Sequence, residues 1–141
     1  MYETEIRNKE FEDIEKWNNK LILKTMLESQ NNAFDAVKKD LQSIETAVSL
    51  ATKKLKNDSA KIVYVGAGTS GRIGILDGVE LIPTFGWPEN RIDFCFSGID
   101  VKKASEGSED NIELALKHFK EVNITEHDVV LFLAASGSTI Y

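Results

Sequence analysis

The sequence predicts an α/β fold: an open parallel sheet of the flavodoxin type with helices on both faces, preceded by a helical hairpin. Three short apolar runs, each suited to a strand, alternate with helical segments after about residue 58. Connections that pass through helices join parallel strands, and parallel sheets are covered on both faces. We therefore expect a helical segment over 1–58 and the amino-terminal part of an α/β domain over 59–141.

The helical segment holds no glycine or proline and repeats apolar residues at steps of three and four. One stripe begins at Phe11, Ile14 and Trp17, and a second begins at Phe34 and ends at Leu55. We expect two helices packed as a hairpin. Spacing alone does not decide whether the second stripe is internal scaffold or a contact with another subunit.

The second region alternates strands and helices. The predicted strands are Lys61–Val65, Arg91–Ser97 and Asp128–Ala134, and the predicted helices are Ser70–Leu81 and Glu109–Phe119. Each crossover is expected to be right-handed. No helix follows the third strand to cover it, so we expect a fragment or half of a larger domain.

The composition excludes several functions. The net charge is −6 and the 17 basic residues are scattered, which argues against a nucleic-acid groove or an anionic membrane surface. Cys95 is the single cysteine, so no internal disulfide forms, and its apolar neighbours predict a buried thiol. His118 and His127 have polar neighbours and read as surface residues, so we expect no metal. No signal peptide or membrane span is evident, which favours the cytoplasm.

Two strands end in turns rich in glycine and hydroxyl groups, and the carboxyl ends of parallel strands meet at one edge of the sheet. Backbone N–H groups of such turns approach an anion closely, and Ser70 can cap the helix that follows. Together the turns predict a clamp around one phosphate ester, and two ordinary strand-to-helix turns remain the alternative. The candidate binding residues are Gly66, Gly68, Thr69, Ser70, Gly71, Arg72, Ser136, Ser138 and Thr139.

The first turn also fits the Gly-x-Gly-x-x-Gly pattern of dinucleotide-binding folds. That reading requires an acidic residue at the end of the second strand, about 20 residues past the glycines. Asp100 is the one candidate, and it lies too far along the chain and outside the strand. A Walker-type loop is excluded because no Gly-Lys-Ser/Thr ending is present. A monophosphate is the better prediction.

Two carboxylates suggest acid/base chemistry. Glu80 falls near the end of the first predicted helix of the α/β region, just before an expected loop over 82–88 that could shield it from water. Glu109 begins the second helix near the end of the second strand. A solvated surface glutamate is the commoner explanation for Glu80, and a helix-start residue favoured by the dipole is the alternative for Glu109. The residues alone therefore support acid/base catalysis only as a hypothesis.

At these residues the sequence resembles the N-acetylmuramic acid 6-phosphate etherases, a family with a sugar isomerase (SIS) domain. The resemblance runs through nearly the whole chain and covers about the first half of a family member. The motifs that carry it are Val63–Asp77, Glu80, Pro83–Gly86, Glu106–Asp110 and Ala134–Gly137.

The resemblance implies a cytoplasmic bacterial lyase of cell-wall sugar recycling. Such an enzyme removes the D-lactyl ether of N-acetylmuramic acid 6-phosphate by elimination and water addition, giving D-lactate and N-acetylglucosamine 6-phosphate. It is usually a homodimer, here expected to form through helices and the sheet edge, and it needs no metal or organic cofactor. Glu80 would assist departure of lactate and addition of water, and Glu109 would be its partner in proton transfer. Which of the two removes the C2 proton stays open.

Among the positions that depart from the family pattern, two bear on the prediction. Ser138 occupies the place of an arginine that commonly follows the second loop's glycine, which puts the sugar attached to the phosphate in question. Gly78 replaces an alanine and is expected to loosen its helix by up to ~1 kcal/mol. The alternatives to a lyase are a non-catalytic sugar-phosphate sensor and a domain whose helical arm mediates assembly. We expect this chain alone to be inactive.

Overall fold

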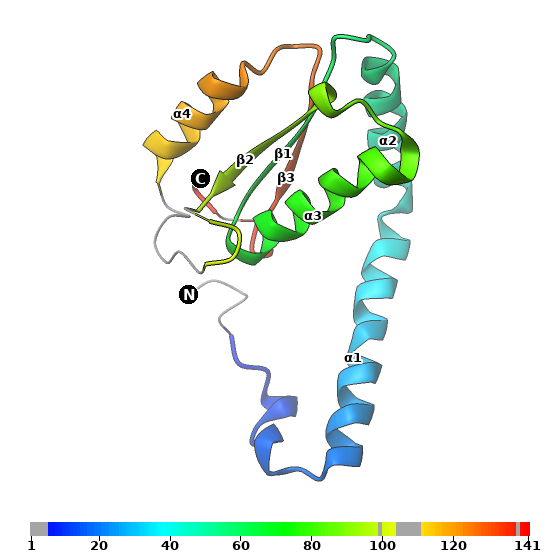
Figure 1. The fold of residues 1–141 in the computed structure, drawn as a ribbon. Coiled ribbons are helices and arrows are strands. Elements are labelled where there is room, and N and C mark those ends of the chain that lie inside the picture. The colour runs from blue at the N-terminus through cyan, green and yellow to red at the C-terminus, as the bar shows by residue number, and fades with distance from the viewer. Residues whose placement is uncertain (1–5, 99, 104–110, 138) are drawn as a thin grey trace. The chain divides into compact units, whose positions relative to one another are not determined.

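The computed structural model describes residues 6–98, 100–103, 111–137 and 139–141. The chain divides into two compact units, Met1–Leu50 and Ala51–Tyr141. The α/β architecture predicted from the sequence is confirmed in the second unit (Figure 1). The predicted boundary after residue 58 stays a prediction.

The amino-terminal segment is helical, but its helices are divided differently from the prediction. Two single 3-10 turns, Lys9–Phe11 and Ile14–Lys16, precede α1 (Asn19–Lys39) and α2 (Leu41–Leu55). The early stripe forms no long helix because Asp13 has a left-handed φ of 56°.

The predicted hairpin is wrong within this segment. Asp40 alone separates α1 from α2, and its backbone continues the helical hydrogen-bond pattern on both sides. Its N–H donates to the Val37 carbonyl at 3.1 Å, and its own carbonyl accepts from the Ile44 N–H at 3.0 Å. The chain therefore runs on instead of reversing. Phe34, Val37 and Ile44 are exposed, so the structure leaves the role of this stripe open.

The sheet has three parallel strands, β1 (Ile62–Ala67), β2 (Ile92–Ser97) and β3 (Val129–Leu133), in the order β2-β1-β3. These strands fall within one or two residues of the predicted runs. β1 is central, and all its residues after Ile62 are buried, which explains its continuous apolar sequence.

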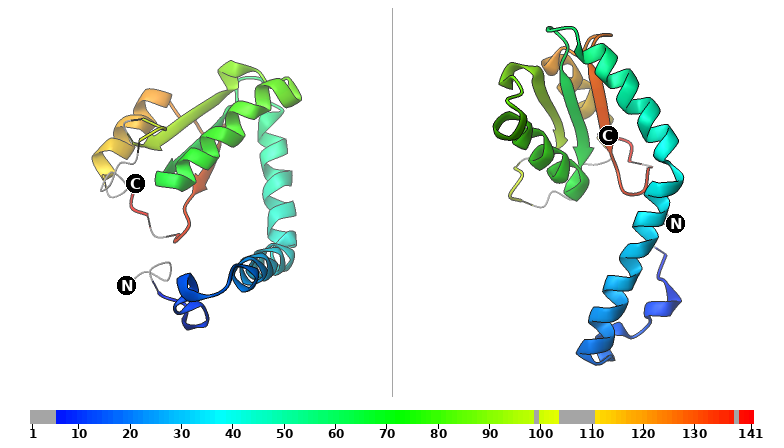
Figure 2. Two further views of the ribbon diagram at one scale, coloured as in Figure 1. Left: turned by 60° about the horizontal axis from the view of Figure 1, so that its bottom comes forward. Right: turned by 90° about the vertical axis from the view of Figure 1, so that its right-hand side faces the viewer.

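Helices cover both faces of the sheet, as predicted. α3 (Gly68–Phe85) packs on one face and α4 (Ile112–Val122) on the other (Figure 2). On the α4 face, Val63, Val65 and Cys95 form a buried cluster. Its partly buried apolar neighbours are Phe119, Val122, Ile124, Val130 and Tyr141.

α3 is longer than the prediction, since the expected loop over 82–88 contributes its last turn. Pro83 is accommodated inside the helix. Gly86 ends the helix at a left-handed φ of 64°, and its N–H donates to the Ile82 carbonyl while the Trp87 N–H donates to the Leu81 carbonyl. A glycine in the left-handed conformation is a common way for a helix to end, and these two bonds satisfy carbonyls of the last turn.

A row of glycines lets α3 approach the sheet. Gly71, Gly74 and Gly78 are the buried residues of the helix. A Cβ at Gly78 would lie 2.6 Å from the Phe94 ring and 2.9 Å from the Tyr64 ring, which themselves stack at 5.8 Å. The missing side chain makes room for these two rings, a packing role that the sequence did not predict. The expected loosening of the helix at Gly78 stays a prediction.

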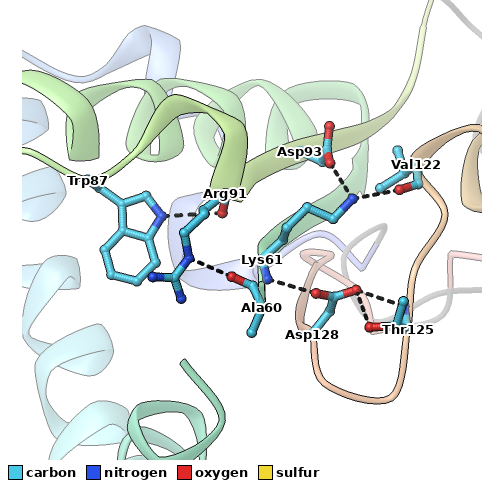
Figure 3. A network of polar contacts seen from close by, with 8 residues as sticks. All are labelled: Ala60, Lys61, Trp87, Arg91, Asp93, Val122, Thr125 and Asp128. Carbon is cyan, nitrogen blue, oxygen red and sulfur yellow. Dashed lines mark hydrogen bonds and ion pairs between the residues drawn. The ribbon is translucent and has the colours of Figure 1, made fainter. Parts of the chain in front are cut away.

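Polar side chains tie the elements together where the strands begin, as Figure 3 shows. Asp128 accepts from the N–H groups of Lys61 and Thr125 at 2.7 Å each and from the Thr125 hydroxyl at 3.0 Å. Lys61 extends from there to the Asp93 carboxylate at 2.8 Å and the Val122 carbonyl at 2.7 Å. All three strands and the end of α4 are therefore linked at this edge.

Arg91 closes the same edge on the side of α2. Its guanidinium donates to the carbonyls of Leu55, Asn57 and Ala60 at 2.8–2.9 Å and lies 4.7 Å from the centre of the Trp87 ring. One side chain thus holds the last carbonyl of α2 and two carbonyls of the turn that leads into β1.

Candidate functional site

The site predicted from the sequence lies at the opposite edge, where β1 and β3 end. The chain leaves β1 toward β2 on one side and returns to β3 on the other, so the strand order reverses between β1 and β3. Ligands of open α/β sheets bind at such a reversal, beyond the carboxyl ends of the strands. The two hydroxyl-rich turns flank this point.

The first turn is the amino end of α3. The helix begins at Gly68, with Ala67 as its N-cap, and among the described residues no side chain caps it. Ser70 therefore lies inside the first turn, and its predicted role as the cap is wrong. Because the first N–H groups of a helix have no intrahelical partner and the helix dipole is positive there, this turn suits an anion. The hydroxyls of Thr69, which is exposed, and Ser70, which is half-buried, belong to it.

The glycines of the first turn have distinct physical roles. Gly68 adopts a φ of 54°, and a Cβ there would meet open space. Glycine is therefore favoured by the left-handed backbone conformation and not by a lack of space for a side chain. A Cβ at Gly66 would lie 2.8 Å from the Gly71 Cα, and a Cβ at Gly71 would lie 2.6 Å from the Gly66 oxygen. These two residues let the start of α3 rest directly against β1.

The second turn borders a cavity of about 220 Å³ at the ends of β1 and β3. Gly66 lines this cavity from the first turn, and Gly137 and Thr139 line it from the second. Ser136 is exposed, and Ser138 lies outside the described residues. The two predicted turns therefore border the same cavity. Of the predicted binding residues, Gly66 and Thr139 line it, together with the neighbouring Gly137.

Tyr141, which was not among the candidate residues predicted from the sequence, also lines the cavity. Its hydroxyl contacts Nδ1 of His118 on α4, and the two rings meet edge to face at 5.9 Å. His118 is half-buried, so its interpretation as a surface residue is wrong. Burial raises the pKa of Tyr141, which keeps its phenol protonated. The pair fastens the second turn to α4.

Arg72 contacts protein carbonyls instead of standing free at the turn. Its Nε donates to the Val101 carbonyl at 2.8 Å, and a second guanidinium nitrogen donates to the Lys103 carbonyl. Its place among the phosphate-binding residues therefore remains a prediction.

Glu80 is distant from the first turn within one chain. It lies ten residues beyond Ser70 in α3, about 15 Å along the helix axis. Glu80 is exposed, on the side of α3 opposite to the buried Gly71, since nine residues make about two and a half turns. Of the residues 82–88 that were expected to shield it, 82–85 continue the helix. Glu109 lies outside the described residues. The pairing of the two glutamates therefore stays a prediction.

Other titratable groups near the sheet are structural. Cys95 is 1% exposed, as its apolar neighbours predicted, and burial raises the pKa of its thiol to about 11. The Tyr64 hydroxyl donates to Asp77 at 2.7 Å, and burial together with this carboxylate raises the pKa of the tyrosine. Among the described residues, no three His, Cys, Asp or Glu side chains cluster to hold a metal, and no helix is long and apolar enough to cross a bilayer.

The model of the glucokinase regulatory protein N-terminal SIS domain matches residues 25–140. The chain belongs to this SIS-domain family. N-acetylmuramic acid 6-phosphate etherases of Bacillus mycoides and Listeria welshimeri are 39% and 38% identical to it over 140 residues, 98% of the chain. The chain spans 47% of the length of each, about half. The resemblance stated from the motifs is thereby confirmed.

Proposed function

We propose that this SIS-domain chain is part of a cytoplasmic lyase that removes the lactyl ether of N-acetylmuramic acid 6-phosphate. The observation that carries the proposal is the meeting of two turns at the strand-order reversal: the uncapped start of α3 and the cavity bordered by Gly137 and Thr139. The 6-phosphate lies against the first N–H groups of α3, where the helix dipole and the hydroxyls of Thr69 and Ser70 stabilise it. The sugar extends into the cavity.

The reaction is an elimination followed by addition of water. A carboxylate removes the proton at C2 of the open-chain aldose, and a protonated carboxyl group helps lactate to leave from C3. Water then adds to the unsaturated aldehyde, so that N-acetylglucosamine 6-phosphate and D-lactate are released. Glu80 and Glu109 carry these proton transfers.

The position of Glu80 supports a site shared by two copies. Within one chain its distance of about 15 Å from Ser70 exceeds the reach of a sugar anchored at the first turn. The outer face of α3 is apolar and exposed at Ile73 (58%) and Leu76 (64%). If two copies pack their α3 helices antiparallel about a two-fold axis near Leu76, Glu80 of one copy lies beside the first turn of the other.

The assay is release of D-lactate from N-acetylmuramic acid 6-phosphate by the native protein that contains this chain. Removal of an acid/base carboxylate lowers the rate by roughly 10²–10⁴. We therefore expect that loss from Glu80→Gln and from Glu109→Gln, whereas Glu89→Gln, an exposed glutamate at the opposite edge, keeps full activity. Undiminished activity of both test variants would contradict the assigned roles.

Mixing two impaired variants, with activity measured well below the native KM, tests the shared site. One copy carries Glu80→Gln, and the other carries both Thr69→Ala and Ser70→Ala. Random exchange of subunits makes half of the dimers hybrid, and each hybrid has one intact site of two, so about a quarter of native activity returns. A site built within one chain gives no recovery.

A second candidate is a non-catalytic sugar-phosphate sensor. It is favoured by the match to a domain of a regulatory protein and by Ser138 in the place of the expected arginine. Saturable binding of N-acetylglucosamine 6-phosphate, without turnover of the muramic acid substrate under any condition that preserves the fold, would support this function over the lyase.

A further inference from the structure

Arg72 makes two contacts with the segment that follows β2 and one with Phe96 in β2 itself. Two guanidinium nitrogens donate to the carbonyls of Val101 and Lys103, the first at 2.8 Å. The guanidinium carbon lies 5.8 Å from the centre of the Phe96 ring. Carbonyls that point at one planar fork of donors are held in a fixed geometry, which a point charge such as lysine does not reproduce.

The segment that Arg72 holds is a defined turn. The Lys103 N–H donates to the Asp100 carbonyl at 3.1 Å, and the Lys102 N–H donates to the Asp100 carboxylate at 2.9 Å. These bonds leave the carbonyls of Val101 and Lys103 to the arginine. The turn and its anchor are therefore complementary.

The Phe96 ring is tightly packed where Arg72 meets the segment after β2. A Cβ at Gly71 would lie 2.7 Å from the ring, and a Cβ at Gly98 would lie 2.3 Å from it. The ring thus fits among two glycines and the Arg72 guanidinium. An arginine confined at such a junction differs from a solvated surface cation.

We infer that Arg72 is a positioning residue that fastens the turn at Asp100–Lys103 to the first helical turns of α3. The chain runs from this turn into the connection that carries Glu109, so the anchor places the start of that connection next to the phosphate turn. This role replaces the phosphate contact predicted from the sequence. It rests on the proposed function only where it concerns Glu109.

The test compares Arg72→Lys, Arg72→Ala and a charge-loss control, Lys117→Ala on the exposed side of α4. Trypsin cleaves after Lys102 and Lys103, so its rate at these sites reports release of the turn. Loss of charge-assisted hydrogen bonds is expected to raise this rate about tenfold in both Arg72 variants and to leave the control unchanged. Cleavage after Lys120 serves as the internal reference.

Binding of N-acetylglucosamine 6-phosphate separates positioning from phosphate contact. A positioning role leaves its Kd within about twofold of native in both variants and lowers kcat for lactate release while KM stays constant. A phosphate role raises Kd about tenfold or more in Arg72→Ala, is partly rescued in Arg72→Lys, and leaves proteolysis unchanged; that result would overturn the inference. If the native protein releases no lactate, the proposed function fails, whereas proteolysis and Kd still decide the role of Arg72.

Discussion

The two edges of the sheet are built on opposite principles. Where the strands begin, Asp128 is 7% exposed and every oxygen of its carboxylate accepts hydrogen bonds, and Arg91 holds three carbonyls. Where the strands end, α3 starts without a side-chain cap among the described residues, and Thr69 and Ser136 are exposed. One edge uses its polar groups to join elements, whereas in our proposal the other offers the first N–H groups of α3 and the Thr69 hydroxyl to a ligand.

This difference predicts which substitutions lower the stability of the fold and which weaken ligand binding. Polar groups satisfied within the protein contribute to folding, and their loss leaves buried partners without hydrogen bonds. Polar groups directed at a ligand contribute to binding, and their loss changes stability little. The predictions below test this division.

The largest effect is expected from Asp128→Ala. This change leaves the N–H groups of Lys61 and Thr125 without their acceptor and is expected to destabilise the fold by about 2–4 kcal/mol. Urea denaturation measures the loss, and the midpoint should fall without a change in slope. An effect below about 1 kcal/mol would show that water replaces the carboxylate.

Asp128 also predicts a pH dependence. Burial raises the pKa of this carboxyl, but the hydrogen bonds from Thr125 and Lys61, with the Lys61 charge, outweigh burial and hold the pKa below its ordinary value. A lowered pKa in the folded state stabilises the protein above the unfolded pKa of about 3.9, and this contribution is lost as pH falls through the folded value. Unfolding free energies at pH 3–6 should therefore fall less steeply in Asp128→Asn than in the native chain.

A smaller loss is expected from Gly78→Ala. Alanine favours the helix by up to ~1 kcal/mol, but its methyl group overlaps the Phe94 ring, and overpacking costs about 1–3 kcal/mol. We expect a net destabilisation of about 1–2 kcal/mol by thermal unfolding. The control is Gly86→Asn, since Gly86 has open space and a left-handed φ that asparagine tolerates. A more stable Gly78→Ala protein would mean that the rings move aside freely.

At the other edge, Ser70→Ala should weaken binding of N-acetylglucosamine 6-phosphate by about 3- to 12-fold, the worth of one hydrogen bond. The melting temperature should stay within experimental error because the hydroxyl caps no helix. Isothermal titration measures the affinity. A lowered melting temperature with unchanged affinity would reverse the assignment of this edge.

The smallest effect is expected from Asp93→Asn. The Lys61–Asp93 ion pair is 2.8 Å long, but the Asp93 side chain is 38% exposed. Solvent screening limits such a pair to about 0–1 kcal/mol, and added salt should remove the difference from the native protein. A larger, salt-independent loss would show that this ion pair belongs to the buried network around Asp128.

The strands and the two turns could be predicted because their signals are local. Continuous β-branched runs followed directly by glycine leave few alternatives for β1 and for the start of α3. The end of α3 was missed because Pro83 is tolerated in a last turn that Gly86 closes, and the division of α1 from α2 depends on a single residue, Asp40.

The rest of the site depends on tertiary contacts. Tyr141 contacts His118, and Arg72 contacts the turn after β2. Both contacts join residues far apart in the sequence, so no rule based on residue spacing predicts them. The distance between Glu80 and Ser70 is different, because the rise per residue of an α-helix predicts it once both residues are assigned to one helix. This distance could therefore have been predicted from the sequence.

The buried thiol of Cys95 offers a built-in measurement. It is the single cysteine of the chain, and with a pKa of about 11 it is protonated at neutral pH and closed to reagents in the folded state. A thiol-reactive dye therefore labels the chain only when the sheet opens, and the labelling rate follows the opening equilibrium. Each variant can thus be ranked in dilute buffer, without denaturant and without introducing a probe.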